Sequence, residues 1–340
     1  MPAPLTVEDV REAQRRIAPY LQPTPLYHWP ALGELVGAEV WVKHENHQPV
    51  GAFKVRGGIN LVSQLSEAER LRGLIAASTG NHGQSIAYAA RLAGVRARIC
   101  VPEGANALKV AAIQSLGAEI VVHGRDFDEA REHCEHLADE HGYRYVHSGD
   151  EPLLIAGVAT ETLEILERQP EIDVVIVPVG GGSGAAGACI VAKAIRPETE
   201  VIAVQSEAAP AAYRAWRENL NRNDSRLHLA SSSKRRLVED RMETFAEGLA
   251  TRAAFALPQR VLVEHLDDFV LVSDDEIREA IVLMLEGTRN LVEAAGAAPL
   301  AAALRLRVQL EGRRVALVCS GGNITAAQLA DVLARQRPAA

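Results

Sequence analysis

Residues 174–187, with the sequence VVIVPVGGGSGAAG, decide the fold class of this chain. Val174–Val179 is a short apolar run of mostly β-branched residues, which is typical of a strand that is buried on both faces. Three glycines and Ser183 follow it, and the alanine-rich stretch Gly184–Ala194 then has helical spacing. A buried strand that passes through a tight loop into a helix is the unit from which parallel α/β sheets are built.

The same alternation of short apolar runs and longer helical stretches recurs along the chain. The predicted strands are Glu39–Lys43, Gly73–Ala77, Ala97–Val101, Glu119–His123, Val174–Val179, Val201–Gln205 and Arg314–Val318. The predicted helices are Gln84–Leu92, Leu108–Leu116, Phe127–His141, Gly184–Ala194, Asp274–Val292 and Ile324–Arg335. Residues 73–147 hold three complete strand–helix units and a second series begins at Val174, so we expect an α/β fold with two doubly wound parallel-sheet lobes.

The composition is that of a globular protein with an acidic balance. The 340 residues are 48% hydrophobic and 24% charged and carry a net charge of −8, whereas nucleic-acid binders usually present a basic surface. No apolar run approaches the roughly 20 residues of a membrane span, and the N-terminal residues are charged where a signal peptide would be apolar. The four cysteines form no C-x-x-C pair. We therefore expect a cytoplasmic protein without extracellular disulfides that binds neither nucleic acid nor membrane.

The loop Gly180-Gly181-Gly182-Ser183 is a candidate anion site. Residues without side chains let backbone N–H groups converge on a phosphate, and the following helix adds the partial positive charge of its N-terminus. Tight packing of helix on sheet is the alternative explanation. Gly182, Gly184 and Gly187 also match G-x-G-x-x-G, and Glu207 follows about 20 positions later, as in a dinucleotide-binding unit. The loop alone leaves open which phosphorylated cofactor would bind.

Three further segments combine a turn with polar side chains. Lys54 lies among small residues, where partial desolvation would lower the pKa of its amine and make it a nucleophile or base; a solvated surface lysine is the alternative. The segment Ser78-Thr79-Gly80-Asn81-His82 lies between a predicted strand and a predicted helix and suits a carboxylate, unless its side chains merely cap the helix. Ser320 follows the last predicted strand in the sequence CSGGN, where a simple tight turn is the alternative.

The order of these four segments resembles the pyridoxal-phosphate-dependent serine/threonine dehydratases, whose relatives include serine racemase, tryptophan synthase β and cysteine synthase. The resemblance extends from Pro23-Thr24-Pro25-Leu26 to Ser320, which is nearly the whole chain. It implies two lobes with the cofactor, pyridoxal 5′-phosphate, in the cleft between them. Residues 1–66 together with 150–340 would form the large cofactor-binding domain, and residues 67–149 would form the small domain.

The resemblance also implies a role for each matching residue. Those that would bind the cofactor are Phe53, Lys54, Asn81, Gly180, Gly181, Gly182, Ser183 and Ser320. Those that would line the pocket for the substrate carboxylate are Ser78, Thr79 and His82. Lys54 would form the Schiff base and later act on the Cα proton, Asn81 would bind the phenolic oxygen of the ring, and Ser320 would face the pyridine nitrogen. A serine hydroxyl does not favour a protonated ring, so the ring is a weaker electron sink and loss of a β-leaving group is favoured.

The implied activity is that of an ammonia-lyase, or dehydratase, that converts a β-hydroxy-α-amino acid, L-threonine or L-serine, to a 2-oxo acid and ammonia by α,β-elimination. The alternatives are a specialist dehydratase for phenylserine or 3-hydroxyaspartate, an amino-acid racemase of the same family and, from another class, a nicotinamide-dependent oxidoreductase. The acidic positions that bind a divalent cation in serine racemase correspond to Gln205 and Ala211, so we expect no metal there. Little chain follows Gly322, so we expect no appended effector-binding domain. The family implies a homodimer or homotetramer.

Overall fold

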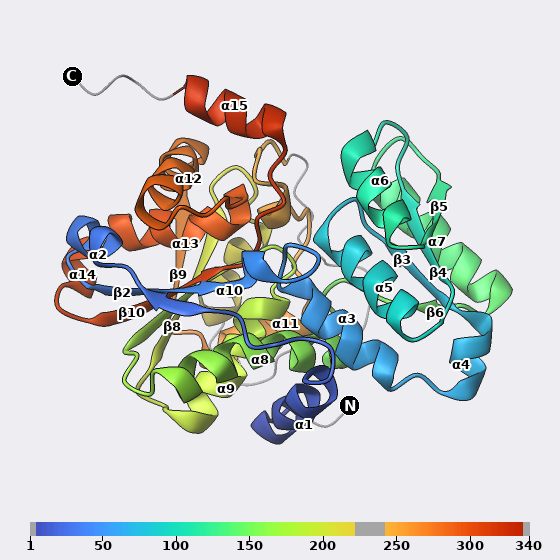
Figure 1. The fold of residues 1–340 in the computed structure, drawn as a ribbon, viewed down its shortest axis with the longest axis horizontal. Helices are drawn as coiled ribbons and strands as arrows, with labels where there is room; N and C mark the ends of the chain where they lie inside the picture. Colours follow the sequence, from blue (N-terminus) through green and yellow to red (C-terminus); the bar gives the residue numbers. More distant parts are fainter. Residues whose placement is uncertain (1–4, 222–241, 336–340) are drawn as a thin grey trace. The chain divides into compact units, whose positions relative to one another are not determined.

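The computed structural model describes residues 5–221 and 242–335 (Figure 1). By their contacts these residues form two compact units. The first unit contains the residues up to 22 and residues 48–160, and the second contains residues 23–47 and the described residues from 161 on. Each unit has a sheet of its own, which confirms the predicted α/β fold with two parallel-sheet lobes.

The first unit is built on a four-stranded parallel sheet in the order β5-β4-β3-β6. Its strands are β3 (Leu74–Ala77), β4 (Ala97–Val101), β5 (Glu119–Val122) and β6 (Arg144–Tyr145). Its helices are α1 (Val7–Ile17), α3 (Lys54–Ser63), α4 (Glu67–Arg72), α5 (Asn81–Leu92), α6 (Ala107–Ser115), α7 (Phe127–His141) and the first part of α8 (Pro152–Arg168).

Alternate residues of β3 enter two different cores. Leu74 and Ala76 pack in a cluster with residues of α5, whereas Ile75 and Ala77 pack with Cys134 of α7. Successive side chains of a strand point to opposite faces of the sheet, so α5 and α7 cover opposite faces. This is the doubly wound arrangement that nearly all-apolar strands predict.

The second unit is built on a six-stranded sheet in the order β1-β2-β10-β7-β8-β9, in which β1 is antiparallel to β2 and the other pairs are parallel. Its strands are β1 (Leu26–His28), β2 (Glu39–His44), β7 (Val174–Pro178), β8 (Glu200–Ser206), β9 (Asp268–Val272) and β10 (Arg314–Cys319). Its α-helices, besides the end of α8, are α2 (Pro30–Val36), α9 (Ser183–Ile195), α10 (Ala211–Asn221), α11 (Ala256–His265), α12 (Asp274–Thr288), α13 (Ala294–Arg305), α14 (Arg307–Leu310) and α15 (Ala326–Ala334). Two 3₁₀ turns are η1 (Glu45–His47) and η2 (Glu247–Leu249).

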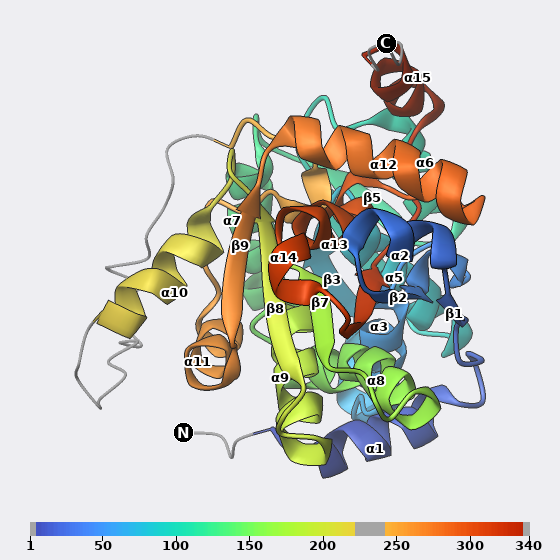
Figure 2. The same cartoon turned by 90° about the vertical axis from the view of Figure 1, so that its left-hand side faces the viewer.

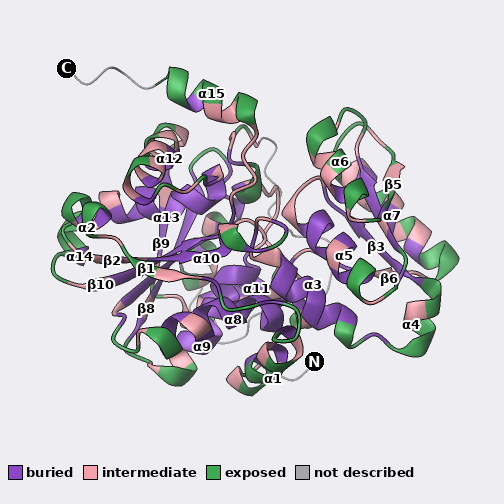
Figure 3. Ribbon diagram, in the orientation of Figure 1, coloured by how far each residue is buried: buried purple, intermediate pink, exposed green. Residues whose placement is uncertain are grey.

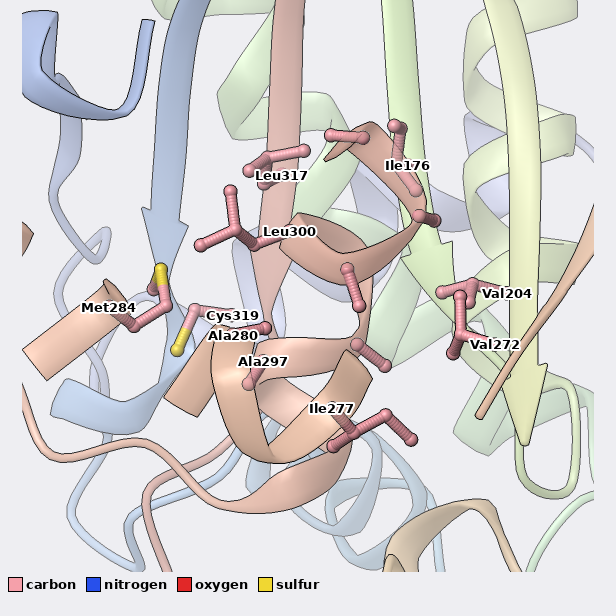
Figure 4. Close-up of a cluster of buried hydrophobic side chains, with 14 of the residues drawn as sticks. Ile176, Val204, Val272, Ile277, Ala280, Met284, Ala297, Leu300, Leu317 and Cys319 are labelled. Atoms are coloured by element: carbon pink, nitrogen blue, oxygen red, sulfur yellow. The ribbon is translucent and has the colours of Figure 1, made fainter. Parts of the chain in front are cut away.

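The main core of the second unit lies between its sheet and helices α12 and α13. Figures 1 and 2 show these two helices on one side of the sheet and α9 on the other, and α9 contacts β7 and β8. Except for the edge strand β1, the strands are buried along most of their length (Figure 3). Small side chains let α13 contact β7, β8, β9 and β10 at once. In Figure 4, Ile277 and Met284 of α12 and Ala297 and Leu300 of α13 pack in one cluster with side chains of the strands. The strand residues include Ile176 of β7, Val204 of β8 and Leu317 of β10.

The predicted elements agree closely with the observed ones. Every predicted strand is present with its ends shifted by at most one residue. The helix predicted over Asp274–Val292 ends at Thr288, because Arg289 adopts a left-handed φ of 60° that closes α12. The elements that were not predicted include the strands β1, β6 and β9 and the helices α2, α3, α4, α8, α10, α11, α13 and α14. In α3, Gly57 and Gly58 lower the helix propensity of the sequence. Within the described residues, no helix is long and apolar enough to cross a membrane.

The contact-based units differ from the predicted lobes in where three helices belong. The four-stranded sheet lies within residues 67–149, and the six-stranded sheet lies outside them. By contacts, however, α1, α3 and the start of α8 belong with the four-stranded sheet. The physical reason is that α3 packs along α5. Lys54, at the start of α3, is therefore part of the first unit.

Candidate active site

Lys54 is the first residue of α3, and hydrogen bonds fix it at both ends. Its amine donates a hydrogen bond to the carbonyl oxygen of Ser148 at 3.2 Å. Its own carbonyl oxygen accepts a hydrogen bond of 2.6 Å from the hydroxyl of Ser85 on α5. The amine also lies 5.1 Å from the centre of the Phe53 ring, in a cation–π contact. Lys54 is half-buried, and its amine is held in place instead of being freely solvated.

The predicted carboxylate segment follows β3 and opens α5. The Ser78 hydroxyl accepts the backbone N–H of Gly80 at 3.1 Å, and Ser78 and His82 are buried. The Nε2 atom of His82 lies 3.1 Å from the carbonyl oxygen of Val146. Since a carbonyl can only accept, this nitrogen carries the ring proton.

The imidazole of His82 is neutral, which changes what it can contribute to a carboxylate pocket. Burial and the nearby Lys54 amine lower the pKa of His82 to about 3. Its Nδ1 atom is buried without a hydrogen-bond partner among the described residues, and it can only accept. A carboxylate needs donors, so the useful donors of this segment are the hydroxyls of Ser78 and Thr79 and the N–H groups at the start of α5.

The glycine loop of the second unit runs from β7 into α9. A Cβ added to Gly180 would lie 2.2 Å from the carbonyl oxygen of Gly248, and one added to Gly182 would lie 2.9 Å from Pro258. Gly182 has a φ of +88°, a left-handed conformation that favours glycine. Ser183 is the first residue of α9 and is only 1% exposed. The loop thus has no room for side chains at positions 180 and 182, and a helix N-terminus follows it, which fits the phosphate of pyridoxal phosphate.

Ser320 lies at the same edge of the six-stranded sheet as this loop. Strands β10 and β7 are parallel neighbours in which Leu317 pairs with Ile176, so both strands end at one edge. Ser320 directly follows β10 and is 3% exposed. Ligands of open α/β sheets bind outside the carboxyl ends of the strands. The topology therefore brings the Ser320 hydroxyl and the glycine loop to the edge where a ligand is expected.

Glu207, the acidic residue of the alternative dinucleotide-binding pattern, follows β8 but is already engaged. Both terminal nitrogens of Arg305 lie 3.1 Å from its Oε1 atom. Arg305 also donates to the carboxylate of Glu276 at 2.8 Å. A ribose-binding carboxylate must be available to sugar hydroxyls, so this ion-pair network does not favour the nicotinamide alternative.

The positions that correspond to the racemase cation site hold no pair of carboxylates. The side-chain oxygen of Gln205 accepts the backbone N–H of Tyr213 at 3.1 Å, and Ala211 begins α10. Across residues 5–221 and 242–335, no group of three His, Cys, Asp or Glu side chains could hold a metal ion. That no metal is needed stays a prediction.

Comparison with known proteins agrees with this geometry. Residues 17–321 match the profile of the family described as "Pyridoxal-phosphate dependent enzyme". The chain therefore belongs to this family. The cofactor, pyridoxal phosphate, and the enzyme class, a pyridoxal-phosphate-dependent lyase, are confirmed as the sequence predicts them.

Three relatives cover nearly the whole chain. L-threonine ammonia-lyase of Thermotoga maritima is 38% identical over 323 residues, which are 94% of this chain and 76% of that protein. L-threo-3-hydroxyaspartate ammonia-lyase of Saccharomyces cerevisiae is 34% identical over 319 residues, which are 94% of this chain and 93% of that protein. The crystal structure of serine racemase from Dictyostelium discoideum superposes with a TM-score of 0.84 at 32% identity, covering 95% of this chain and 100% of that one.

Sequence reasoning missed the segment that contacts the Lys54 amine. Residues 146–151 join β6 to α8, and β6 pairs with β3 in parallel, so this segment and Ser78 leave the four-stranded sheet at the same edge. The sequence His147-Ser148-Gly149-Asp150 is rich in turn-forming residues, and that composition was the available signal. The segment lies close to Lys54 because β6 pairs with β3, and the order of strands in a sheet cannot be inferred from this sequence alone.

Proposed function

We propose that this enzyme is an ammonia-lyase acting on a small β-hydroxy-α-amino acid, L-threonine or L-serine, with release of a 2-oxo acid and ammonia. The observation that carries the proposal is the Lys54 amine, held 3.2 Å from the Ser148 carbonyl at the start of a buried helix. A single positioned amine can both anchor a carbonyl cofactor and act as a base. The identity of 38% to a protein named L-threonine ammonia-lyase supports the substrate class.

Each predicted site residue has a part in this reaction. Bound pyridoxal phosphate supplies a ring that takes up electron density when a bond at Cα breaks. Lys54 would anchor the cofactor, and its amine would act as the base for the Cα proton. Ser320 would offer the cofactor an uncharged hydroxyl, which favours loss of the β-hydroxyl. The residues that would hold or orient the two ligands are Phe53, Ser78, Thr79, Asn81, His82, Gly180, Gly181, Gly182 and Ser183.

The anchoring role of Lys54 is tested by reductive trapping. Protein purified with pyridoxal phosphate should be yellow, lose the colour on borohydride treatment and carry the reduced adduct on the peptide that contains Lys54. Lys54→Ala should carry no adduct and lose steady turnover. Lys193→Ala is the matched control, because Lys193 is also on a helix but its amine is paired with Asp267. A Lys54→Ala protein that keeps steady turnover contradicts the proposal.

The substrate is tested by measuring 2-oxo acid release from a panel of amino acids. L-threonine and L-serine should give the highest kcat/KM. Preference for L-threo-3-hydroxyaspartate or phenylserine would instead identify a specialist dehydratase. Conversion of L-serine to D-serine without 2-oxo acid would identify a racemase. An oxidoreductase would consume a nicotinamide cofactor, whereas a lyase or a racemase would not.

We also propose a cytoplasmic location and a homodimeric or homotetrameric assembly. All four cysteines are buried free thiols, which suits a reducing compartment. Fractionation of the source cells and light scattering of the purified enzyme test these two points.

A further inference from the structure

The loop that contacts the Lys54 amine is shaped by one histidine. His147 lies in the segment between β6 and α8, and its Nδ1 atom accepts the backbone N–H of Gly149 at 3.0 Å and that of Asp150 at 2.8 Å. An imidazole nitrogen that accepts cannot carry a proton, so the ring proton of the neutral His147 lies on Nε2. The side chain thus closes a local turn in the way that Asp and Asn side chains do in Asx turns.

The carbonyl groups of the residues before and after His147 contact side chains on the two helices α5 and α3. The carbonyl oxygen of Val146, before His147, lies 3.1 Å from Nε2 of His82 on α5. The carbonyl oxygen of Ser148, after it, accepts the hydrogen bond from the Lys54 amine. His147 therefore organises a short stretch of backbone that contacts both of these side chains.

Other contacts hold the helices before and after this turn. The Lys54 carbonyl is held by Ser85, and the Asn60 amide donates to the carbonyl of Leu153 at 2.8 Å. Glu151 pairs with Arg144 and receives the N–H of Leu153 at 3.3 Å, which holds the start of α8. Residues 147–150 lie between these fixed points, so the His147 turn decides where the Ser148 carbonyl lies.

We propose that His147 is a positioning residue for Lys54. Its Nδ1 atom holds the turn that presents the Ser148 carbonyl to the amine, and the carbonyl orients the amine toward the atom that it must attack or deprotonate. The catalytic consequence rests on the proposed function, whereas the effect on the loop and on Lys54 does not. A displacement of about 1 Å at a reacting group can lower a rate by as much as a hundredfold.

The test compares His147→Ala with His147→Asn in the holoenzyme. Alanine removes the acceptor, whereas the asparagine Oδ1 atom can accept the same two N–H groups. In His147→Ala, hydrogen exchange of the Gly149 and Asp150 amides should accelerate about tenfold, as loss of one or two hydrogen bonds predicts. The visible absorption of the Lys54-bound cofactor should shift, and kcat should fall about ten- to a hundredfold with a smaller change in KM. His147→Asn should restore exchange, absorption and kcat to within about threefold of the wild type.

One control and one replacement variant complete the test. His136→Ala, on the exposed side of α7, should change none of the three readouts. If His147→Ala does not fold, His147→Gln replaces it, because its longer side chain moves the acceptor away from the turn. The proposal is overturned if the Ala or Gln variant keeps the wild-type absorption and kcat, or if Asn rescues no better than Ala or Gln. Failure of the proposed function would appear differently, as a wild-type enzyme that binds cofactor at Lys54 but releases no 2-oxo acid.

Discussion

Gly157 of α8 lies against Gly57 of α3 so closely that a Cβ on Gly157 would come within 2.6 Å of the Gly57 Cα atom. The same Cβ would lie 2.7 Å from the carbonyl oxygen of Arg56. Two backbones meet here without side chains between them, and one of them carries Lys54. This contact sets the distance between the helix that begins with the reactive amine and the helix that follows the Ser148 loop.

Gly157→Ala should therefore destabilise the protein despite the higher helix propensity of alanine. Overpacking against backbone costs about 1–3 kcal/mol, which outweighs the gain of about 1 kcal/mol in propensity. Gly287→Ala is the matched control, because a Cβ there would meet only the end of the Leu32 side chain, at 2.7 Å. Urea unfolding should show a clear loss for Gly157→Ala and little change for Gly287→Ala; equal effects would contradict this packing account.

The pair Lys43–Glu164 is buried, and removing one partner should be costly. The side chain of Lys43 is 1% exposed and that of Glu164 is 10% exposed, and the amine also donates to the Thr24 carbonyl at 2.8 Å. Glu164→Ala leaves a buried ammonium without its carboxylate, so we expect a loss of about 3 kcal/mol in the free energy of unfolding. Glu8→Ala removes an ion pair whose side chains are 66% and 64% exposed, and it should change stability by less than about 1 kcal/mol.

A double substitution checks the reason for that loss. Lys43→Met with Glu164→Leu replaces both charges by apolar side chains of similar size, and it should recover most of the stability lost in Glu164→Ala. A double variant as unstable as Glu164→Ala would mean that packing at this position, and not the unpaired charge, causes the loss.

His44 makes the stability depend on pH. Burial, the neighbouring His47 and, to a smaller extent, Lys43 lower its pKa to about 4, although a hydrogen bond with Asn46 raises it. Its Nε2 atom accepts the Trp29 indole N–H at 3.0 Å, so protonation would remove this bond. The unfolded chain takes up a proton below about pH 6.5 and the native state only near pH 4, so the stability that is present above pH 6.5 is lost as the pH falls through this window.

His44→Gln removes this titration. Between pH 7.5 and pH 5 the variant should lose about 2 kcal/mol less stability than the wild type in urea unfolding. His136→Gln, on the exposed side of α7, should follow the wild-type curve. Parallel curves for His44→Gln and the wild type would show that His44 does not titrate in this window.

Gly180→Ala should weaken cofactor binding more than it weakens the fold. The new Cβ meets the Gly248 carbonyl oxygen, so the loop that is proposed to hold the phosphate must move. We expect the affinity for pyridoxal phosphate, measured by absorbance titration, to fall at least about tenfold, since each lost charge-assisted hydrogen bond contributes about 1.5–3 kcal/mol. Gly37→Ala, at the left-handed end of α2 where no atom lies within 4 Å of the new Cβ, should lower stability but not this affinity.

Local periodicity predicted the parallel strands of this protein except β6 and β9. Each predicted strand is a short, largely apolar run, and a strand buried on both faces can be recognised from such a run without knowledge of its neighbours. The order of four loop motifs identified the family and predicted Lys54, the glycine loop and Ser320 as site residues. The sequence could predict them because the chemistry of this family needs particular residue types at particular turns. Helix α3 was not predicted, since Gly57 and Gly58 lower its propensity and serve its packing instead.

Only the tertiary structure decided which of these residues can act together. Parallel pairing of β10 with β7 brings Ser320 to the edge of the glycine loop, and pairing of β6 with β3 brings the His147 turn to the start of α5. Burial makes His82 a neutral acceptor, a property that its sequence motif does not reveal. Strand order, close backbone contact and desolvation arise from residues that are distant in the chain, so a single sequence cannot display them.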